Sequence, residues 1–287
     1  MGHIQQVKKQ LILTASGLAL VASLFFFGRT VATKVKQEPV NLPNVKTFDI
    51  QQFIEQEKKQ LTPSQVITLG NLENSVKRGD IPTQQIAANT QLANFWKDSA
   101  HAFEPYAWYL SEAAKLDKSE KNLTFAAQLI LGSLRGEPDD AKLSWKTDLA
   151  VELFEKAIEL NPTNDDLKIG LASCYVFGKG RTGGPQETMK GIQQLLEVVR
   201  RDSTNMKAQL VLGIGGYVSG QYDKAIDRLQ KVVMAQPNNL EAIAFLADTY
   251  AAKGNNAEAI KWYTISKRLA DNPEYSKEVD ERIKALR

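Results

Sequence analysis

The sequence is poor in the side chains that bind transition metals and form disulfides. Among 287 residues it has one cysteine, Cys174, and two histidines, His3 and His101. One cysteine cannot form an intramolecular disulfide, and two distant histidines do not indicate a zinc site. Cys174 lies among apolar residues, so we interpret it as a packed thiol. Because no nucleophile, base and orienting group occur together, we predict neither an enzyme nor a bound cofactor or metal.

Acidic side chains are absent from the first 37 residues. This segment holds five Lys or Arg and no Asp or Glu, so the other 250 residues carry a net charge of about −2 out of the chain's +3. Proteins that bind nucleic acids usually have a basic surface. The charge of the body therefore argues against a nucleic-acid partner.

Charged residues are also absent from residues 11–28, LILTASGLALVASLFFFG. As a helix these 18 residues would rise about 27 Å, close to the hydrocarbon thickness of a bilayer. We predict an uncleaved transmembrane anchor behind a short tail, residues 1–10. A cleaved signal peptide is the alternative, although its apolar core usually has about 7 to 15 residues.

Basic residues flank the predicted anchor on both sides, so the positive-inside rule does not fix its orientation. By default we expect a single-pass protein of the inner membrane with its body in the periplasm. A cytoplasmic body is the alternative. Residues 29–47, which include VKQEPVNLPNVK, predict an extended linker between the anchor and the body.

Beyond the linker, apolar residues recur three and four positions apart, without a convincing run of alternating apolar and polar residues. The body is therefore predicted to be all-α. Several candidate helices start at proline, whose missing N–H is harmless in the first turn. The predicted starts are near Pro63, Pro82, Glu104, Glu120, Lys146, Asp165, Pro185, Met206, Tyr222, Leu240, Asn256 and Pro273.

An internal repeat of 34 residues links residues 213–239 with residues 247–273. The matched pairs are Gly220 with Gly254, Ala225 with Ala259, and Ile226 with Ile260. A period of 34 residues is typical of repeated helical hairpins. Residues 149–164, LAVELFEKAIELNPTN, supply the second helix and closing turn of a further hairpin.

These residues resemble the tetratricopeptide repeat (TPR) family. The positions that match the family's small crossing residues and exit prolines are Gly213, Ala247, Ala150, Ala225, Ala259, Pro162 and Pro237. Residues 206–239 and 240–273 match closely. Residues 121–164 and 165–205 match after insertions of about ten and seven residues in the turn within each hairpin.

The resemblance implies a superhelical solenoid of helical hairpins over residues 121–273 behind the transmembrane helix. Residues 48–120 are predicted to form an N-terminal helical region of degenerate repeats. Residues 274–287 are predicted to form a capping helix, because solenoids need a polar outer end.

The stretch GKGRTGGP, residues 178–185, fits the dinucleotide pattern G-x-G-x-x-G, with Asp202 where an acidic ribose partner would lie. That fingerprint requires a preceding strand, and here a helix is expected. We therefore predict an enlarged turn closed by Pro185, similar to the lengthened turn of Sel1-type repeats. Lys179 and Arg181 are possible contacts for an acidic partner or a lipid headgroup.

Two other chemical patterns are interpreted as structural. Trp96, Trp108, Trp145 and Trp262 stand at helical spacing, which is typical of packing residues. Asp139 and Asp140 lie in a proline-containing turn, which is typical of a solvated loop.

The first helices of stacked hairpins line an inner surface that commonly binds peptides or helices. The predicted groove residues, spaced four apart on three helices, are Phe125, Leu129, Ile169, Ser173, Phe177, Leu210, Ile214 and Val218. This set is mostly apolar, so we predict an amphipathic helix or an extended segment of a partner protein as the ligand. Alternatively, residues 48–61, FDIQQFIEQEKKQL, or the N-terminal helices fill the groove.

The resemblance to bacterial anchored TPR proteins, including those that assist cytochrome c maturation, implies a membrane-tethered scaffold or adaptor. Such a protein would recruit a partner in envelope assembly, secretion or chaperone delivery. The alternative is an auxiliary structural subunit whose anchor helix makes the main contact.

Overall fold

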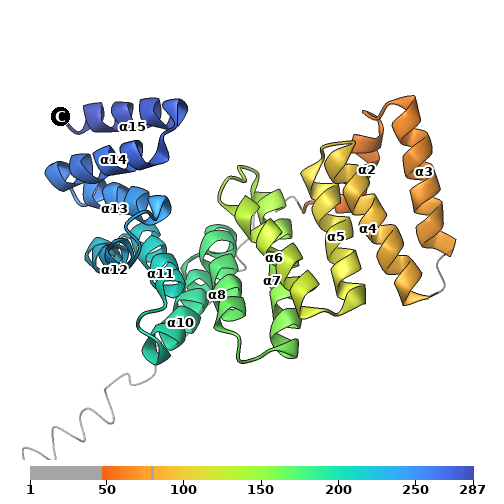
Figure 1. Ribbon diagram of the computed structural model, residues 1–287, viewed down its shortest axis with the longest axis horizontal. Helices are drawn as coiled ribbons and strands as arrows, with labels where there is room; N and C mark the ends of the chain where they lie inside the picture. Colours follow the sequence, from red (N-terminus) through yellow and green to blue (C-terminus); the bar gives the residue numbers. More distant parts are fainter. Residues whose placement is uncertain (1–46, 79–80) are drawn as a thin grey trace, which may run out of the picture. The chain divides into compact units, whose positions relative to one another are not determined.

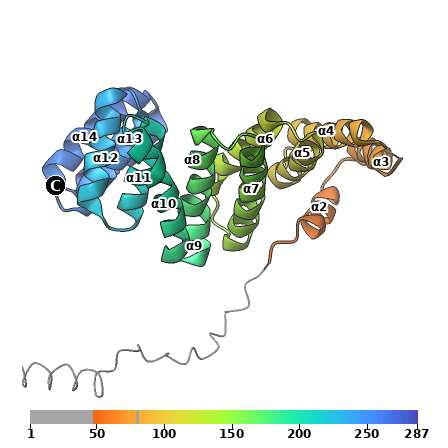
Figure 2. The same cartoon turned by 90° about the horizontal axis from the view of Figure 1, so that it is seen from below.

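The computed structural model describes residues 47–78 and 81–287, and the side chains of residues 76–78 are not described. Within these residues every regular element is a helix, which confirms the all-α prediction (Figures 1 and 2). The helices are α2 (Ile50–Lys58), α3 (Pro63–Arg78), α4 (Pro82–Asp98), α5 (Phe103–Asp117), α6 (Glu120–Leu134), α7 (Asp140–Leu160), α8 (Asp165–Cys174), the π-helical turn η1 (Tyr175–Lys179), α9 (Gly180–Gly183), α10 (Pro185–Arg201), α11 (Met206–Val218), α12 (Tyr222–Ala235), α13 (Leu240–Ala252), α14 (Asn256–Ala270) and α15 (Pro273–Ala285).

Successive helices pack in pairs, α4 with α5, α6 with α7, α8 with α10, α11 with α12, and α13 with α14 (Figure 1). The second helix of each pair contacts the first helix of the next pair. Neighbouring first helices also touch, α6 with α8, α8 with α11, and α11 with α13. The last four pairs correspond to the repeats predicted at residues 121–164, 165–205, 206–239 and 240–273.

An asparagine begins the first helix in three of these repeats. Asn164, Asn205 and Asn239 each accept a hydrogen bond from a backbone N–H in the first turn, at 3.0 Å in every case. An Asn at this position satisfies a donor that has no partner inside the helix, and it stabilises the helix by about 1 kcal/mol. The motifs NPTN, DSTN and QPNN therefore set where each repeat starts.

Small residues allow the two helices of a hairpin to cross closely. A Cβ atom added to Gly213 would lie 2.7 Å from Cγ of Leu229 on the partner helix. Ala150, Ala225 and Ala259 on the second helices have no exposed area. These are the positions that the repeat pattern assigned to the helix crossing.

The N-terminal helices have a core of their own, centred on Trp96, which has no exposed area. Ile54 of α2 is buried in this cluster, and the Phe48 ring lies 5.0 Å from the Trp145 ring, measured between centroids. The amphipathic stretch 48–61 thus packs beside α5 and Trp145 of α7, the second helices of their pairs. The four tryptophans contribute to helix packing.

The insertion in the first repeat lengthens a helix instead of a turn. Helix α7 begins at Asp140, not near Lys146, and has 21 residues, whereas α12 has 14. Asp139 caps its start by accepting hydrogen bonds from the N–H groups of Ala141 and Lys142 at 2.8 and 2.9 Å. Leu143 and Thr147 are fully buried, so the added turns pack against the core.

The glycine stretch is helical, which differs from the open turn expected from its composition. Residues 175–179 form the π-helical turn, α9 follows, and Gly184, with φ of 85°, precedes Pro185 at the start of α10. A Cβ atom on Gly178 would lie 2.1 Å from Oγ1 of Thr147. The chain needs glycine here because it passes directly against the lengthened part of α7.

Two predicted segments, the tail (1–10) and the anchor (11–28), lie outside the described residues, as does the linker up to residue 46. Among the helices that are described, none combines the length and the apolar character needed to cross a bilayer.

Candidate functional site

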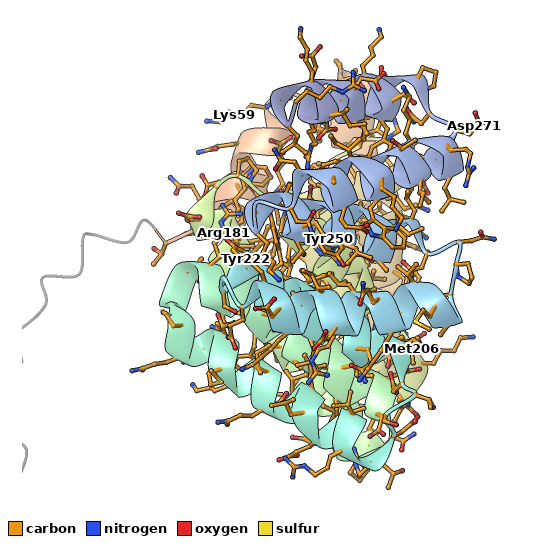
Figure 3. All side chains as sticks on the ribbon, turned by 90° about the vertical axis from the view of Figure 1, so that its left-hand side faces the viewer. Lys59, Arg181, Met206, Tyr222, Tyr250 and Asp271 are labelled. Carbon is orange, nitrogen blue, oxygen red and sulfur yellow. The ribbon has the colours of Figure 1, made fainter. Side chains whose placement is uncertain are left out.

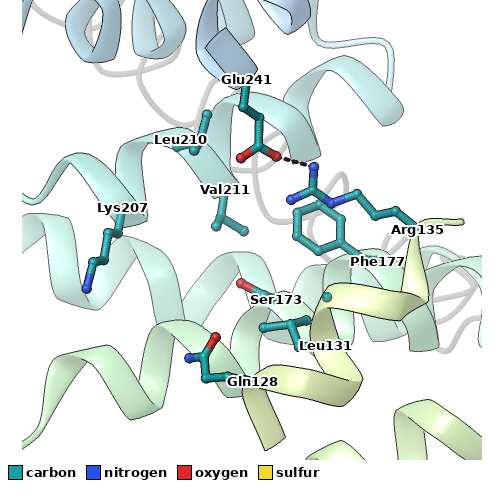
Figure 4. A pocket seen from close by; sticks show the side chains of 10 residues that line it. Gln128, Leu131, Arg135, Ser173, Phe177, Lys207, Leu210, Val211 and Glu241 are labelled. Atoms are coloured by element: carbon teal, nitrogen blue, oxygen red, sulfur yellow. Dashed lines mark hydrogen bonds and ion pairs between the residues drawn. The ribbon is translucent and has the colours of Figure 1, made fainter. Parts of the chain in front are cut away.

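Four consecutive first helices surround one open cavity of about 420 Å³ (Figure 4). Helices α6, α8 with its π turn, α11 and α13 each contribute at least one residue, although they span more than a hundred residues of sequence. The lining residues are Gln128, Leu131, Gly132, Arg135, Ser173, Phe177, Lys207, Leu210, Val211 and Glu241. We call this cavity the inner groove.

The inner groove has a mixed lining, because apolar side chains such as Leu131, Phe177 and Leu210 alternate with polar and charged ones. The Arg135 guanidinium lies over the Phe177 ring, 4.4 Å from the centroid, and forms an ion pair with Glu241 (Figure 4). This pair connects α6 to α13 across the groove. Both side chains are more than a third exposed, so solvent screens the pair and its contribution to stability is small.

Two polar side chains of the groove, Lys207 and Ser173, already have partners within the chain. Lys207 Nζ lies 2.9 Å from Asp166 Oδ1, and the Ser173 hydroxyl donates a hydrogen bond to the Ile169 carbonyl at 2.7 Å. Ser173 is buried and its hydroxyl proton is held by a backbone carbonyl, so this hydroxyl is not placed as a nucleophile. The arrangement suits the binding of an apolar segment better than bond-making chemistry.

Three of the predicted groove residues, Ser173, Phe177 and Leu210, come together in the inner groove. Ile169 and Ile214 are only 6% and 1% exposed, so they belong to the core between helices. A ligand could not reach them without unfolding the helix pair.

The other three predicted groove residues lie elsewhere. Phe125 is 57% exposed and Leu129 is half-buried on α6, and neither lines the inner groove. Val218 is 64% exposed and lines a different cavity. On α6 the lining stripe is instead Gln128, Leu131 and Arg135.

The sequence prediction did not include this stripe, because only apolar side chains were taken as groove residues on α6. Gln128, Leu131 and Arg135 are spaced three and four apart, which places them on one face of α6. One of the three is polar, one is apolar and one is charged, so an apolar pattern does not mark this face of the helix. Lys207 and Glu241 were missed for a related reason, since they are charged residues in the first turns of α11 and α13, and Val211 was missed because the prediction followed residues four apart from Leu210.

The two cations of the glycine stretch bind to the chain itself. Arg181 donates to the carbonyl of Glu137 at 2.6 Å and to Asp140 Oδ1 at 2.8 Å, and Lys179 pairs with Asp148. They hold η1 and α9 against the α6–α7 turn and the start of α7. A contact with an acidic partner or a lipid headgroup stays a prediction, and it would compete with these bonds.

A buried ion cluster lies beneath that turn. Lys146 Nζ lies 2.6 Å from Glu137 Oε2 and 3.1 Å from Glu104 Oε1, and Lys146 is only 4% exposed. Burial alone would raise the pKa of Glu137, but the hydrogen bonds from Lys146 and from the Asp139 N–H hold that pKa below 4.5. The cluster connects the longer helix α7 to α5, and we interpret its role as structural.

Asp202, the expected ribose partner, has a local role. Its carboxylate accepts from the Thr204 N–H at 2.9 Å and from the Thr204 hydroxyl at 2.6 Å, and these bonds lower its pKa. It closes the turn between α10 and α11. Within the described part of the chain, a helix, not a strand, precedes the glycines.

Family comparisons agree with this architecture. Residues 219–277 and 146–164 each match a family described as tetratricopeptide repeat. The matched segments contain the turn after α11, helices α12 to α14 with the start of α15, and most of α7 with the turn that follows it. These two segments of the chain are therefore similar to tetratricopeptide repeats.

One curated relative is the putative cytochrome c-type biogenesis protein CcmH of Haemophilus influenzae, which is 25% identical over 136 residues. The match covers 44% of this chain and 29% of the relative. The chain thus spans less than a third of the length of that relative.

Solved structures of repeat proteins share the fold. The thermophilic TPR protein TTC0263 of Thermus thermophilus superposes with a TM-score of 0.51 and 16% identity, covering 72% of this chain and 98% of its own. YrrB, described as a TPR protein with an unusual peptide-binding site, has a TM-score of 0.43 and 16% identity, covering 73% of this chain and 97% of its own. At 16% identity the likeness to TTC0263 establishes the fold alone.

Proposed function

We propose that this protein is a scaffold that binds a segment of a partner protein in the inner groove. The observation that carries the proposal is that four successive first helices contribute to one cavity. Repeat scaffolds act in protein–protein interaction, and helical or extended segments are their usual ligands. The apolar side chains of Leu131, Phe177 and Leu210 suit the apolar side of such a segment.

The charged residues of the inner groove define how the partner would enter. Arg135 and Glu241 form an exposed pair across the groove, so a ligand must fit beside this pair or open it. Opening costs little, because exposed ion pairs are worth about 0.2–1 kcal/mol. A partner with its own acidic and basic residues could replace both contacts.

The membrane tether and the cellular role are further parts of the proposal. The uncharged run at residues 11–28 supports a transmembrane anchor, with the body in the periplasm. The likeness to a protein named for cytochrome c-type biogenesis supports a role in assembling envelope proteins. We therefore propose a membrane-tethered adaptor that presents a partner during envelope protein assembly.

A pulldown with matched variants tests the proposal. The double variant Gln128→Asp with Leu210→Asp places charge on two half-exposed or exposed positions of the groove and spares the buried Ile214. Its matched control is Met234→Asp, at an 81% exposed position outside the inner groove.

We expect the groove variant to lose its partners by at least tenfold while the control retains them. Circular dichroism melting of both variants checks that the fold is kept. If the groove variant retained all partners, and a chain lacking residues 11–28 lost them, the protein would instead be an auxiliary subunit held by its anchor.

A further inference from the structure

A second cavity, of about 650 Å³, lies between the second helices α10 and α12, with α11 as its floor. Its walls are mostly apolar. The lining residues are Gly180, Pro185, Thr188, Met189, Ile192, Leu196, Leu212, Gly216, Val218, Ser219, Gln221, Lys224 and Arg228. We call it the outer groove, because it shares none of its lining residues with the inner groove.

The outer groove is open because one repeat lacks a side chain that its neighbours have. Tyr175, Gly216 and Tyr250 each stand eleven residues after the asparagine that caps their helix. Tyr175 packs against the cluster formed by α5 to α8, and Tyr250 packs against the cluster of α12 and α13. Only Gly216 leaves this position of the described repeats empty.

The next repeat shows what normally fills the space. Tyr250 lies near the C-terminal end of α13 (Figure 3), and its hydroxyl accepts a hydrogen bond from Gln230 of α12 at 2.9 Å. Gln230 is six residues before the end cap of α12, and Leu196 is six residues before that of α10. Leu196 and Gly216 thus occupy the places of Gln230 and Tyr250, and both line the open groove.

The two sides of the outer groove differ in chemistry. Met189, Ile192 and Leu196 are spaced three and four apart along α10, and Met189 is 48% exposed. Lys224 and Arg228 stand four apart on α12. One wall is therefore apolar and the other is cationic.

Neutral amides are the hydrogen-bond partners of these cations. Lys224 donates to Gln221 Oε1 at 2.9 Å and Arg228 to Gln209 Oε1 at 2.7 Å, and neither takes part in an ion pair with the described residues. Burial lowers the pKa of Arg228, although neighbouring Asp227 acts in the opposite direction. A half-buried guanidinium with an amide partner attracts an added carboxylate.

We propose that the outer groove binds an acidic amphipathic helix of a partner protein. The lining from Pro185 to Leu196 covers three helical turns, about 16 Å, which is enough to hold the anchors that a helix presents at i, i+4 and i+7 over about 10 Å. Its apolar anchors pack on α10, and its carboxylates face Lys224 and Arg228. A large side chain over Gly216 takes the space that tyrosine fills in the next repeat.

Fluorescence anisotropy with the full chain and synthetic peptides tests this proposal. The probe is a fluorescein-labelled, alanine-based helix of roughly 16 residues (about 4.4 turns) with Trp, Leu and Leu on one face and Glu beside them. One control peptide has Lys in place of Glu, and another has Ala in place of the apolar anchors. We expect the acidic probe to bind at least tenfold more tightly than either control.

Matched variants locate the site. Lys224→Glu and Met189→Asp change exposed side chains of the outer groove, and we expect each to weaken the probe at least tenfold. Lys277→Glu and Met234→Asp are exposed controls that should bind as the wild type does. A third variant, Gly216→Tyr, should block the groove, although its Cβ would lie 3.2 Å from Ala225 Cβ. If the Gly216→Tyr variant misfolds, the Lys224→Glu and Met189→Asp variants still test the proposal.

Any of four results would overturn the proposal. The acidic and basic probes could bind equally, or the Lys224→Glu variant could bind the probe unchanged. Dodecanoate could bind at this site while the peptide does not, which would make the ligand a small amphiphile. Sedimentation could show a self-association that Lys224→Glu abolishes while no peptide binds, which would make the occupant a second copy.

Discussion

At the scale of single residues, the chain uses its few unusual side chains for structure. Cys174 is fully buried, and burial raises the pKa of its thiol. Its neighbours in the sequence already indicated a packed thiol. The burial of Ile169 and Ile214 could not be predicted in the same way, because apolar residues four apart look alike whether they face a core or a groove.

The first prediction concerns Cys174. The thiolate is the reactive form, so the folded protein should react with a thiol reagent at pH 8 only as fast as it unfolds. Absorbance with dithionitrobenzoate should show less than a tenth of the thiol labelled in minutes, and complete labelling in 8 M urea. Rapid labelling of the folded chain would contradict the burial of this residue.

The second prediction concerns the buried pair of Lys146 and Glu137. Lys146→Met leaves the Glu137 carboxylate without its main partner, and this should lower the free energy of unfolding by about 3 kcal/mol. Urea denaturation at pH 7 measures the change. Adding Glu137→Gln should restore part of the loss, since Glu104 still lacks Lys146, and an equal loss in the double variant would indicate a packing effect instead.

The third prediction follows from the lowered pKa of Glu137. A carboxyl whose folded pKa is below its ordinary 4.5 stabilises the fold above that pH and loses this contribution as the pH falls through the lower, folded pKa. The urea midpoint of the wild type should fall between about pH 5 and pH 3. Glu137→Gln should show a smaller fall, and an identical fall would exclude this carboxyl as a source.

At the scale of elements, the sequence predicted most helix starts within one residue, because prolines and asparagines mark them. The largest error was the start of α7. This helix begins at Asp140, because Asp139 caps it and because Leu143 and Thr147 are buried in the core. The π turn was also missed. It depends on the close approach of Gly178 to Thr147, which is a tertiary contact.

The fourth prediction concerns the asparagine caps. Asn239→Ala removes the side-chain acceptor for the Ala242 N–H and should cost about 1 kcal/mol of stability. Asn238→Ala, at the exposed neighbouring position, should change the stability by less than about 0.5 kcal/mol. Thermal melting of both variants makes the comparison. Equal effects would show that Asn239 is not a cap.

At the scale of the whole molecule, the repeat architecture could be predicted from the sequence, but only part of the groove could. Ser173, Phe177 and Leu210 were predicted and lie in the inner groove, because the 34-residue period aligns the first helices. Arg135 and Glu241 are 106 residues apart, and only the stacking of hairpins brings them together. A single sequence contains no local signal for such a pair.

The central claim is that the inner groove binds the partner, and photocrosslinking in cells tests it most directly. A photoreactive phenylalanine at Gln128, an exposed residue of the groove, should crosslink to a partner that mass spectrometry can identify. The same probe at Met234 should give little or none of that product. Crosslinks to the same partner at Met234 or within residues 11–28, but not at Gln128, would contradict the account.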